Sequence, residues 1–282
     1  MSNSTIGEKR VDPFAFFKYL ILTAVALIVL TPLCAAALGG FKSLSELQSN
    51  AFGLPQTWDT SAYRGILSDT RFWRYLGNSA IITFFAVGAT IILSALAGFV
   101  FAFINFRGRD MVLNYFTLGL MFPAASAALP IFIKVRDMGL LDTHLGVIMP
   151  KAAFGLAMSI ILFRRFFKEI PDELREAALV DGASYFFFFR KIILPLSAPI
   201  IATVATIQFV QSWNNYILPL VLLNSEAKYP WPLGIMQFQG EYLQEWNVIL
   251  AFITLTMLPT VLFFLACQKH IVAGLTAGSV KG

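Results

Sequence analysis

The chain has 282 residues, of which 57% are apolar and 13% are charged. Soluble domains carry about a quarter charged residues, so this composition lies outside the globular range and is typical of a protein whose solvent is lipid. The net charge of +5 is spread beside apolar segments rather than gathered in one patch. It therefore indicates membrane topology and argues against nucleic-acid binding.

Six apolar segments are each long enough for a membrane-spanning helix, which needs about 20 residues. The polar residues 1–13 are expected to form an N-terminal tail and residues 273–282 a C-terminal tail. The expected spans are residues 14–38, 78–104, 111–134, 145–167, 196–224 and 247–270. We therefore predict an all-α integral membrane protein with one six-helix domain over residues 14–272.

The first apolar segment has an alternative interpretation as a secretory signal peptide. Basic residues precede it and the small residues 35–37 lie near its end. However, it exceeds the roughly 7–15 apolar residues of a signal peptide, and further spans follow. We therefore expect it to remain as a span.

Orientation follows from the basic residues near the membrane, which favour the cytoplasmic side. With the N-terminus inside, the cytoplasmic segments hold twelve of the 21 Lys and Arg residues and the outer segments hold seven. Both termini and the loop at 168–195 are therefore predicted to be cytoplasmic. The twelve are Lys9, Arg10, Arg107, Arg109, Arg164, Arg165, Lys168, Arg175, Arg190, Lys191, Lys269 and Lys281.

Lys151 is a cation well inside an expected span. Its long side chain is expected to extend outward to the membrane surface, and the alternative is that it lines a cavity. Pro123, Pro130 and Pro150 are expected to kink their helices, which transport proteins tolerate.

The charged loop at 168–195 has the signals of a short helix. Pro171 suits a first helical turn, and Asp172 and Glu173 place negative charge at the positive end of the helix dipole. Gly182 is expected just after this helix, where positive φ favours glycine. A second short helix is expected over residues 184–191.

One face of this first helix is expected to carry small residues. Leu174, Ala177 and Ala178 recur at spacings of three and four. Such a face indicates a docking surface for another protein. The alternative is a solvated amphipathic connector.

The fifth expected span contains the most polar cluster in any span. Neutral amides with aromatic rings suit a sugar, whose hydroxyls need donors and acceptors and whose ring faces pack on aromatic side chains. The alternative is a set of hydrogen bonds that only joins helices. The cluster consists of Gln208, Gln211, Ser212, Trp213, Asn214, Asn215 and Tyr216.

Three segments carry family-specific patterns. The cytoplasmic loop contains Glu176-Ala177-Ala178, then Gly182 after three residues and IILP after nine more, and it resembles the EAA loop of ABC-type import permeases. Residues 213–220, WNNYILPL, look like the fifth-span motif of carbohydrate-importer permeases. Residues 274–282, GLTAGSVKG, are similar to the C-terminal signature of the maltose-type second permease.

This resemblance implies a permease of the bacterial inner membrane that imports a sugar or oligosaccharide by alternating access. It implies three partners: a second homologous permease that completes a heterodimer, a cytoplasmic ATPase dimer and an extracytoplasmic solute-binding protein. The EAA loop would be the coupling helix, seated in a cleft of the ATPase, and the tail would also contact that dimer. The matching positions are Glu176, Ala177, Ala178, Asp181 and Gly182 in the loop, and Thr276, Gly278 and Lys281 in the tail. The aromatic run at 186–189 is unusual for this region, and the resemblance assigns it no role.

The chain itself is not expected to be an enzyme. It has no G-x-x-x-x-G-K-[ST] phosphate loop, so ATP and Mg²⁺ would belong to the partner ATPase and this chain would hold no cofactor or metal. The predicted substrate pathway comprises Gln208, Gln211, Trp213, Asn214, Asn215 and Tyr216. The first alternative is an ion-coupled carrier, which the lack of Asp and Glu in the expected spans disfavours. The second is a membrane scaffold without transport.

Overall fold

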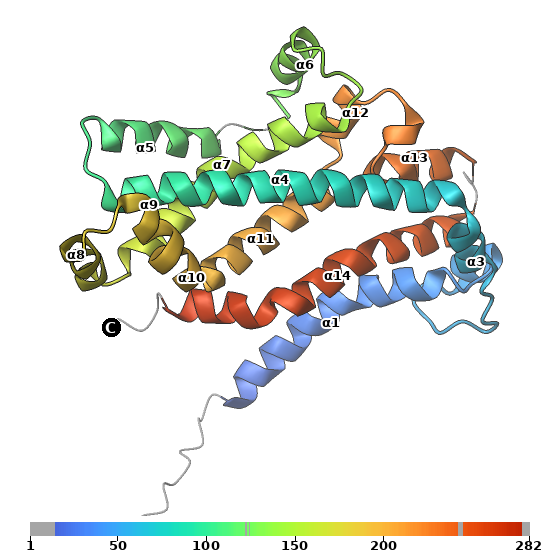
Figure 1. Cartoon of the computed structure of the whole chain (residues 1–282). Coiled ribbons are helices and arrows are strands. Elements are labelled where there is room, and N and C mark those ends of the chain that lie inside the picture. Colours follow the sequence, from blue (N-terminus) through green and yellow to red (C-terminus); the bar gives the residue numbers. More distant parts are fainter. Residues whose placement is uncertain (1–14, 122, 124, 242–244, 278–282) are drawn as a thin grey trace, which may run out of the picture. The chain divides into compact units, whose positions relative to one another are not determined.

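A computed structural model describes residues 15–121, 123, 125–241 and 245–277 (Figure 1). Every regular element in these residues is a helix, which confirms the predicted all-α class. Short 3₁₀ turns lie at Gly119–Met121 and Glu226–Lys228, and a π turn lies at Phe189–Ile193. The α-helices are α1 (Ala15–Gly39), α2 (Leu44–Ser49), α3 (Ser61–Ser68), α4 (Thr70–Phe103), α5 (Arg109–Leu118), α6 (Ala128–Asp137), α7 (His144–Lys168), α8 (Asp172–Val180), α9 (Tyr185–Phe188), α10 (Leu194–Leu196), α11 (Ala198–Trp213), α12 (Ile217–Leu222), α13 (Trp231–Glu241) and α14 (Trp246–Ala277).

Four helices of the described chain are long and apolar enough to cross a membrane. They are α1, α4, α7 and α14. A fifth candidate is the bent pair Tyr185–Leu196 and Ala198–Trp213, whose two parts meet at 75°. Helix α4 has 34 residues, so at 1.5 Å per residue it is about 50 Å long and exceeds the roughly 30 Å hydrocarbon core.

The third expected span is not one continuous helix. Residues 111–134 are divided between α5 and α6, each of 10 residues. Pro123 lies between these helices, and Pro130 lies in the first turn of α6, where a missing N–H costs no hydrogen bond. The break that the prolines predicted is therefore a complete separation of two helices.

The fifth expected span is also divided. Helix α11 has 16 residues and ends at Trp213, residues 214–216 are non-helical, and α12 follows with 6 residues. Asparagine side chains compete for backbone hydrogen bonds, and the Asn215 Oδ1 accepts one from the Leu218 N–H at 3.2 Å. The polar cluster that we expected inside a span therefore lies at a helix break.

The chain forms two compact units. One comprises Met1–Ile66 and Tyr242–Thr254, and the other comprises Leu67–Glu241 and Leu255–Gly282. In the first unit, the buried Lys42 donates from its Nζ to the carbonyls of Asn50 at 2.7 Å and Ala51 at 3.1 Å. These bonds hold the turn after α2.

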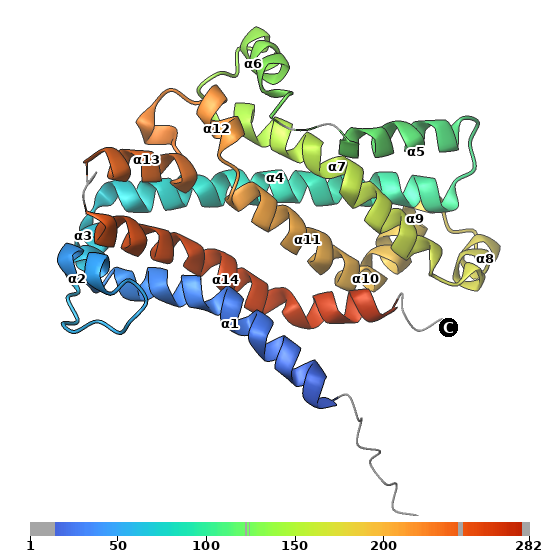
Figure 2. The same cartoon turned by 180° about the vertical axis from the view of Figure 1, so that it is seen from behind.

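The second unit is built on α4, α7 and α11, which contact one another. Figure 2 shows α7 and α11 lying on the same side of α4. Glycine allows the close approach, because a Cβ atom on Gly98 of α4 would lie 2.7 Å from the Phe163 Cβ on α7. These three helices position the polar residues described next.

Candidate functional site

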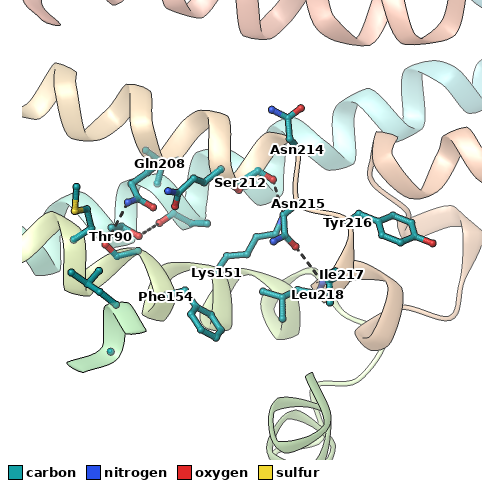
Figure 3. Close-up of a pocket in the computed structure, with 17 residues that line it drawn as sticks. Thr90, Lys151, Phe154, Gln208, Ser212, Asn214, Asn215, Tyr216, Ile217 and Leu218 are labelled. Carbon is teal, nitrogen blue, oxygen red and sulfur yellow. Dashed lines mark hydrogen bonds between the residues drawn. The ribbon is translucent and has the colours of Figure 1, made fainter. Parts of the chain in front are cut away.

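A cavity of about 740 Å³ lies among α4, α7, α11 and α12 of the second unit. Figure 3 shows its lining side chains, which come from helices far apart in the sequence. This volume falls within the roughly 300–1,000 Å³ of small-molecule sites. The polar lining residues are Thr90, Lys151, Gln208, Gln211, Ser212, Asn214, Asn215 and Tyr216.

Lys151 lies on the wall of this cavity, and the prediction that it extends outward to the membrane surface is wrong. It is 8% exposed, and its Nζ donates to the Ser212 carbonyl at 2.9 Å. That carbonyl is in the last turn of α11, where the backbone acceptors carry partial negative charge, and it also accepts from the Asn215 N–H at 3.3 Å. The helix break therefore gives the ammonium group a partner inside the protein.

Gln208 connects α11 to α7 deep in the same cavity. The side chain is 5% exposed, and its Nε2 donates to the Ser159 Oγ at 3.2 Å. Gly155 makes the approach possible, because a Cβ atom there would lie 2.5 Å from the Gln208 Oε1 and 2.9 Å from two side-chain atoms of Thr90. The contact is a tight polar junction of α4, α7 and α11.

The predicted pathway residues do not all face the cavity. Gln208, Gln211, Asn214, Asn215 and Tyr216 line it, although Figure 3 shows the side chains of Asn214 and Tyr216 pointing away from Lys151.

Trp213 is absent from the lining of this cavity. Its Nε1 donates to the Thr256 carbonyl of α14 at 3.1 Å, and its ring stacks on Phe209 at 5.4 Å. It joins helices, which is the alternative that the sequence left open for this cluster.

Two residues of the junction, Thr90 and Gly155, were not among the predicted site residues, and Lys151 was given a cavity-lining role only as an alternative. The Thr90 Oγ1 donates to the Ala86 carbonyl at 2.8 Å and to the Ala152 carbonyl at 3.3 Å, across to α7. A threonine or a glycine in an apolar helix carries little signal alone. The separation of Gly155 from Lys151 by four residues, which places both on one face of α7, could have indicated the junction.

The connection between α12 and α13 is tied to the turn before α7. The Asp142 carboxylate accepts from the backbone N–H groups of Asn224 at 3.0 Å and Ser225 at 2.9 Å, from the Ser225 hydroxyl, and from the Lys228 Nζ at 3.0 Å. The Ser225 hydroxyl and backbone N–H, with the other donors, hold the pKa of the Asp142 carboxyl well below its usual value. Because the Asp142 N–H also donates to the Leu222 carbonyl at 2.8 Å, this tie fixes the end of α12.

The loop at 168–195 forms the predicted helix and glycine turn. Helix α8 begins at Asp172, directly after Pro171, and ends at Val180. Gly182, two residues beyond its end, has a φ of +72°. The Ala183 N–H donates to the Ala178 carbonyl at 2.9 Å, which closes the turn. Ser184 then caps α9 by accepting from the Phe187 N–H at 3.2 Å.

The five predicted coupling residues are not equivalent in this loop. Glu176, Ala177, Asp181 and Gly182 are exposed, whereas Ala178 is buried. Ala178 packs in an apolar cluster with residues of α4 and α7. The expected small-residue face is therefore divided between a surface and a core.

The aromatic run at 186–189 is divided in the same way. Phe186 and Phe187 are exposed, whereas Phe188 and Phe189 are buried. The Phe188 ring lies 5.4 Å from that of Phe103, and the Phe189 ring lies 5.1 Å from that of Phe99. Half of the run thus attaches the loop to α4.

Of the predicted tail residues, Thr276 lies in the last turns of α14, while Gly278 and Lys281 lie outside the described residues. Within the part of the chain that the structure describes, no group of three or more His, Cys, Asp or Glu side chains is arranged to hold a metal ion.

Two membrane-length helices, α4 and α7, border a cavity with polar lining residues at a helix break, an arrangement typical of a membrane transport protein. Residues 91–277 match the family described as "Binding-protein-dependent transport system inner membrane component", and the chain belongs to this family. It is therefore a permease subunit of an inner-membrane ABC importer, and the ATPase is a separate subunit. Family membership confirms the resemblance and does not support the ion-coupled carrier.

Two relatives illustrate the similarity in sequence. The arabinooligosaccharides transport system permease protein AraQ of Halalkalibacterium halodurans is 32% identical, over 92% of this chain and 93% of the relative. The trehalose transport system permease protein SugB of Mycobacterium tuberculosis is 36% identical, over 81% and 84% respectively.

Two solved structures are similar in fold. A chain from a bacterial ABC transporter involved in the import of the acidic polysaccharide alginate matches with a TM-score of 0.79 and 26% identity, over 95% of this chain and 100% of that one. A chain from a bacterial alginate ABC transporter, in complex with its alginate pentasaccharide-bound periplasmic protein, matches with a TM-score of 0.65 at 13% identity and covers 91% and 93%. The second match bears on the fold alone.

Proposed function

We propose that this chain imports a carbohydrate by alternating access through the cavity at the break after α11. The observation that carries the proposal is the lining: neutral amides of Gln208, Gln211 and Asn215 occupy a cavity of saccharide size inside a permease. Amides offer both donors and acceptors to hydroxyl groups. The relatives named for arabinooligosaccharides and trehalose support the same substrate class.

In this proposal the membrane domain has six crossings with both termini in the cytoplasm. Helices α5 and α6 together make the third crossing, and α11 with α12 makes the fifth. Each pair is interrupted, which membrane proteins tolerate where the open backbone lines a cavity or is covered by protein. The excess of Lys and Arg in the inner segments supports the orientation.

Helix α8 is the contact with the cytoplasmic ATPase. Its surface carries Glu176 and Ala177 together with two large apolar side chains, Val180 at 87% exposure and Leu179 at 48%. Exposed apolar side chains on a short charged helix favour a protein interface. Ala178, buried on the other side, would attach the helix to the permease rather than touch the ATPase.

Three partners complete the proposed complex. A second homologous permease forms a heterodimer with this chain, an extracytoplasmic binding protein delivers the substrate, and an ATPase dimer binds α8 and the tail with Thr276, Gly278 and Lys281. The family description, a binding-protein-dependent transport system, supports a binding-protein partner of this kind.

The test is to co-purify the ATPase with permease variants and to measure uptake in proteoliposomes. Glu176→Lys and Gly182→Asp are expected to abolish uptake and to weaken ATPase association. Glu169→Lys is the matched control, because it reverses an exposed charge in the turn before α8. This variant should retain both uptake and ATPase co-purification. Normal co-purification and uptake in both test variants would contradict the coupling role of α8.

A further inference from the structure

The cavity at the end of α11 is lined by one basic side chain and by no acidic one. Its 17 lining residues include Lys151 and no Asp or Glu. Among the residues that the structure describes, no carboxylate lies within ion-pair distance of its Nζ. The neutral polar groups of the wall leave this charge without a counter-charge.

The environment of Lys151 is unfavourable for a permanent lone cation. The residue is 8% exposed, and its one hydrogen bond in the described structure goes to the Ser212 carbonyl. An ammonium group has three donors, so two remain for a ligand. Burying a charge without an opposite charge is costly, and an anion that enters the cavity would relieve that cost.

A purely structural role does not require the charge. A neutral amide donor could bind a backbone carbonyl in the same way, as the Gln208 Nε2 does by donating to the Gly155 carbonyl at 3.5 Å. Figure 3 shows the Lys151 side chain crossing from α7 toward the break after α11, beside Asn215. The Lys151 ammonium group is thus placed beside an amide that can hydrogen-bond to the hydroxyl groups of a sugar.

We propose that the transported saccharide is anionic and that Lys151 is its counter-charge in the cavity. This inference rests on the proposed carbohydrate import. One cation in the lining matches one negative charge on the contacted sugar unit, such as a uronate carboxylate or a sulfate ester. The amides of Gln211 and Asn215 bind neighbouring hydroxyls. Lys151 is therefore a specificity-determining residue.

The test uses the complete complex of this chain, its second permease, its ATPase and its binding protein in proteoliposomes. Matched neutral, uronate and sulfated oligosaccharides are first titrated against the binding protein, and uptake of each is then measured. We expect one of the two anionic series to be bound and transported, and the series that succeeds identifies the anionic group. A binding protein and complex that take only the neutral series would overturn the proposal.

The variants separate charge from structure. Lys151→Gln keeps a donor for the Ser212 carbonyl and removes the charge, so uptake of the anionic saccharide should fall at least tenfold while its affinity for the binding protein is unchanged. Lys151→Arg should retain most uptake. Lys134→Gln, which removes the same charge from an exposed side chain outside the cavity, should behave as wild type.

The two proposals fail in different ways. Undiminished uptake of the anionic saccharide by Lys151→Gln would overturn the role of Lys151 and leave carbohydrate import intact. A wild-type complex that hydrolyses ATP with its loaded binding protein yet moves no saccharide of any series would contradict the proposed function, and the inference with it.

Discussion

Phe188 offers the sharpest test of how the proposed coupling loop, residues 168–195, is attached to the permease. Its ring is 2% exposed and lies 5.4 Å from the Phe103 ring and 6.0 Å from the Phe99 ring, whereas Phe186, two residues earlier, is 65% exposed. Removing a buried Phe side chain costs about 3–5 kcal/mol. Since 1.4 kcal/mol is a factor of ten, even a loss of about 3 kcal/mol makes local opening of the loop roughly a hundredfold more frequent.

Phe188→Ala should therefore leave α8 able to bind the ATPase but unable to transmit its movement. We expect amide exchange in the loop to accelerate by about two orders of magnitude, and uptake per ATP hydrolysed to fall. Phe186→Ala is the matched control and should change neither quantity. Phe188→Leu, which keeps part of the volume, covers the case in which the alanine variant does not assemble. Equal exchange rates and equal coupling in Phe188→Ala and Phe186→Ala would refute the attachment.

Three further predictions follow from single contacts. Gly155→Ala places a Cβ atom 2.5 Å from the Gln208 Oε1, so the unfolding midpoint in detergent should fall by the equivalent of about 1–3 kcal/mol. The control Gly88→Ala adds a Cβ atom that meets nothing within 4 Å, so it should not lower the midpoint. Equal midpoints for the two variants would contradict the tight junction. Hydrogen bonds lower the pKa of Asp142 in the folded chain, so its stabilisation is present above the unfolded value of about 3.9 and is lost as pH falls through the lower folded value. Asp142→Asn should therefore lower the unfolding midpoint at pH 7 and differ less from wild type in strong acid, and a difference that grew in acid would oppose this account. Gly182→Ala forces a φ of +72° on a residue with a Cβ atom, at a cost of about 1–2 kcal/mol, so ATPase co-purification should weaken. Gly182→Asn should weaken it less, because asparagine tolerates positive φ better than alanine. Unchanged co-purification of the alanine variant would show that the turn can change shape.

The features that were predictable from sequence are those fixed by local chemistry. The glycine turn at Gly182 follows from the end of a short helix, and its positive φ confirms the prediction. The long apolar helices α4 and α7 follow from their composition, although α4 begins at Thr70 rather than at residue 78. The polar residues before 78 continue the helix because Asp69 caps it, accepting from the Arg71 N–H at 2.8 Å. Hydropathy marks where lipid begins and carries no information about where a helix begins.

The features that were not predictable depend on which side of a helix meets a neighbour. The sequence around Lys151 is that of an apolar helix whether its side chain faces lipid or the protein interior. The hydrogen bond to the Ser212 carbonyl near the end of α11 is what directs it inward. Phe186 and Phe188 are the same residue type and lie two positions apart, yet the first is exposed and the second is buried against α4. Such outcomes are set by contacts between segments distant in sequence, which local patterns do not contain.

Helix α11 connects the two candidate sites directly. Before it, the chain bends by 75° between Leu196 and Ala198, immediately after the segment that Phe188 and Phe189 attach to α4. After it, residues 214–216 are non-helical, and Lys151 donates to the Ser212 carbonyl in the last turn of α11. The helix has 16 residues and is thus about 24 Å long, with a change of direction at one end and a non-helical break at the other. A regular helix moves as a unit, and rotation is absorbed where helical geometry is interrupted. Movement of the coupling loop should therefore change the shape of the cavity at the break, because the Lys151 contact lies on the segment that must move.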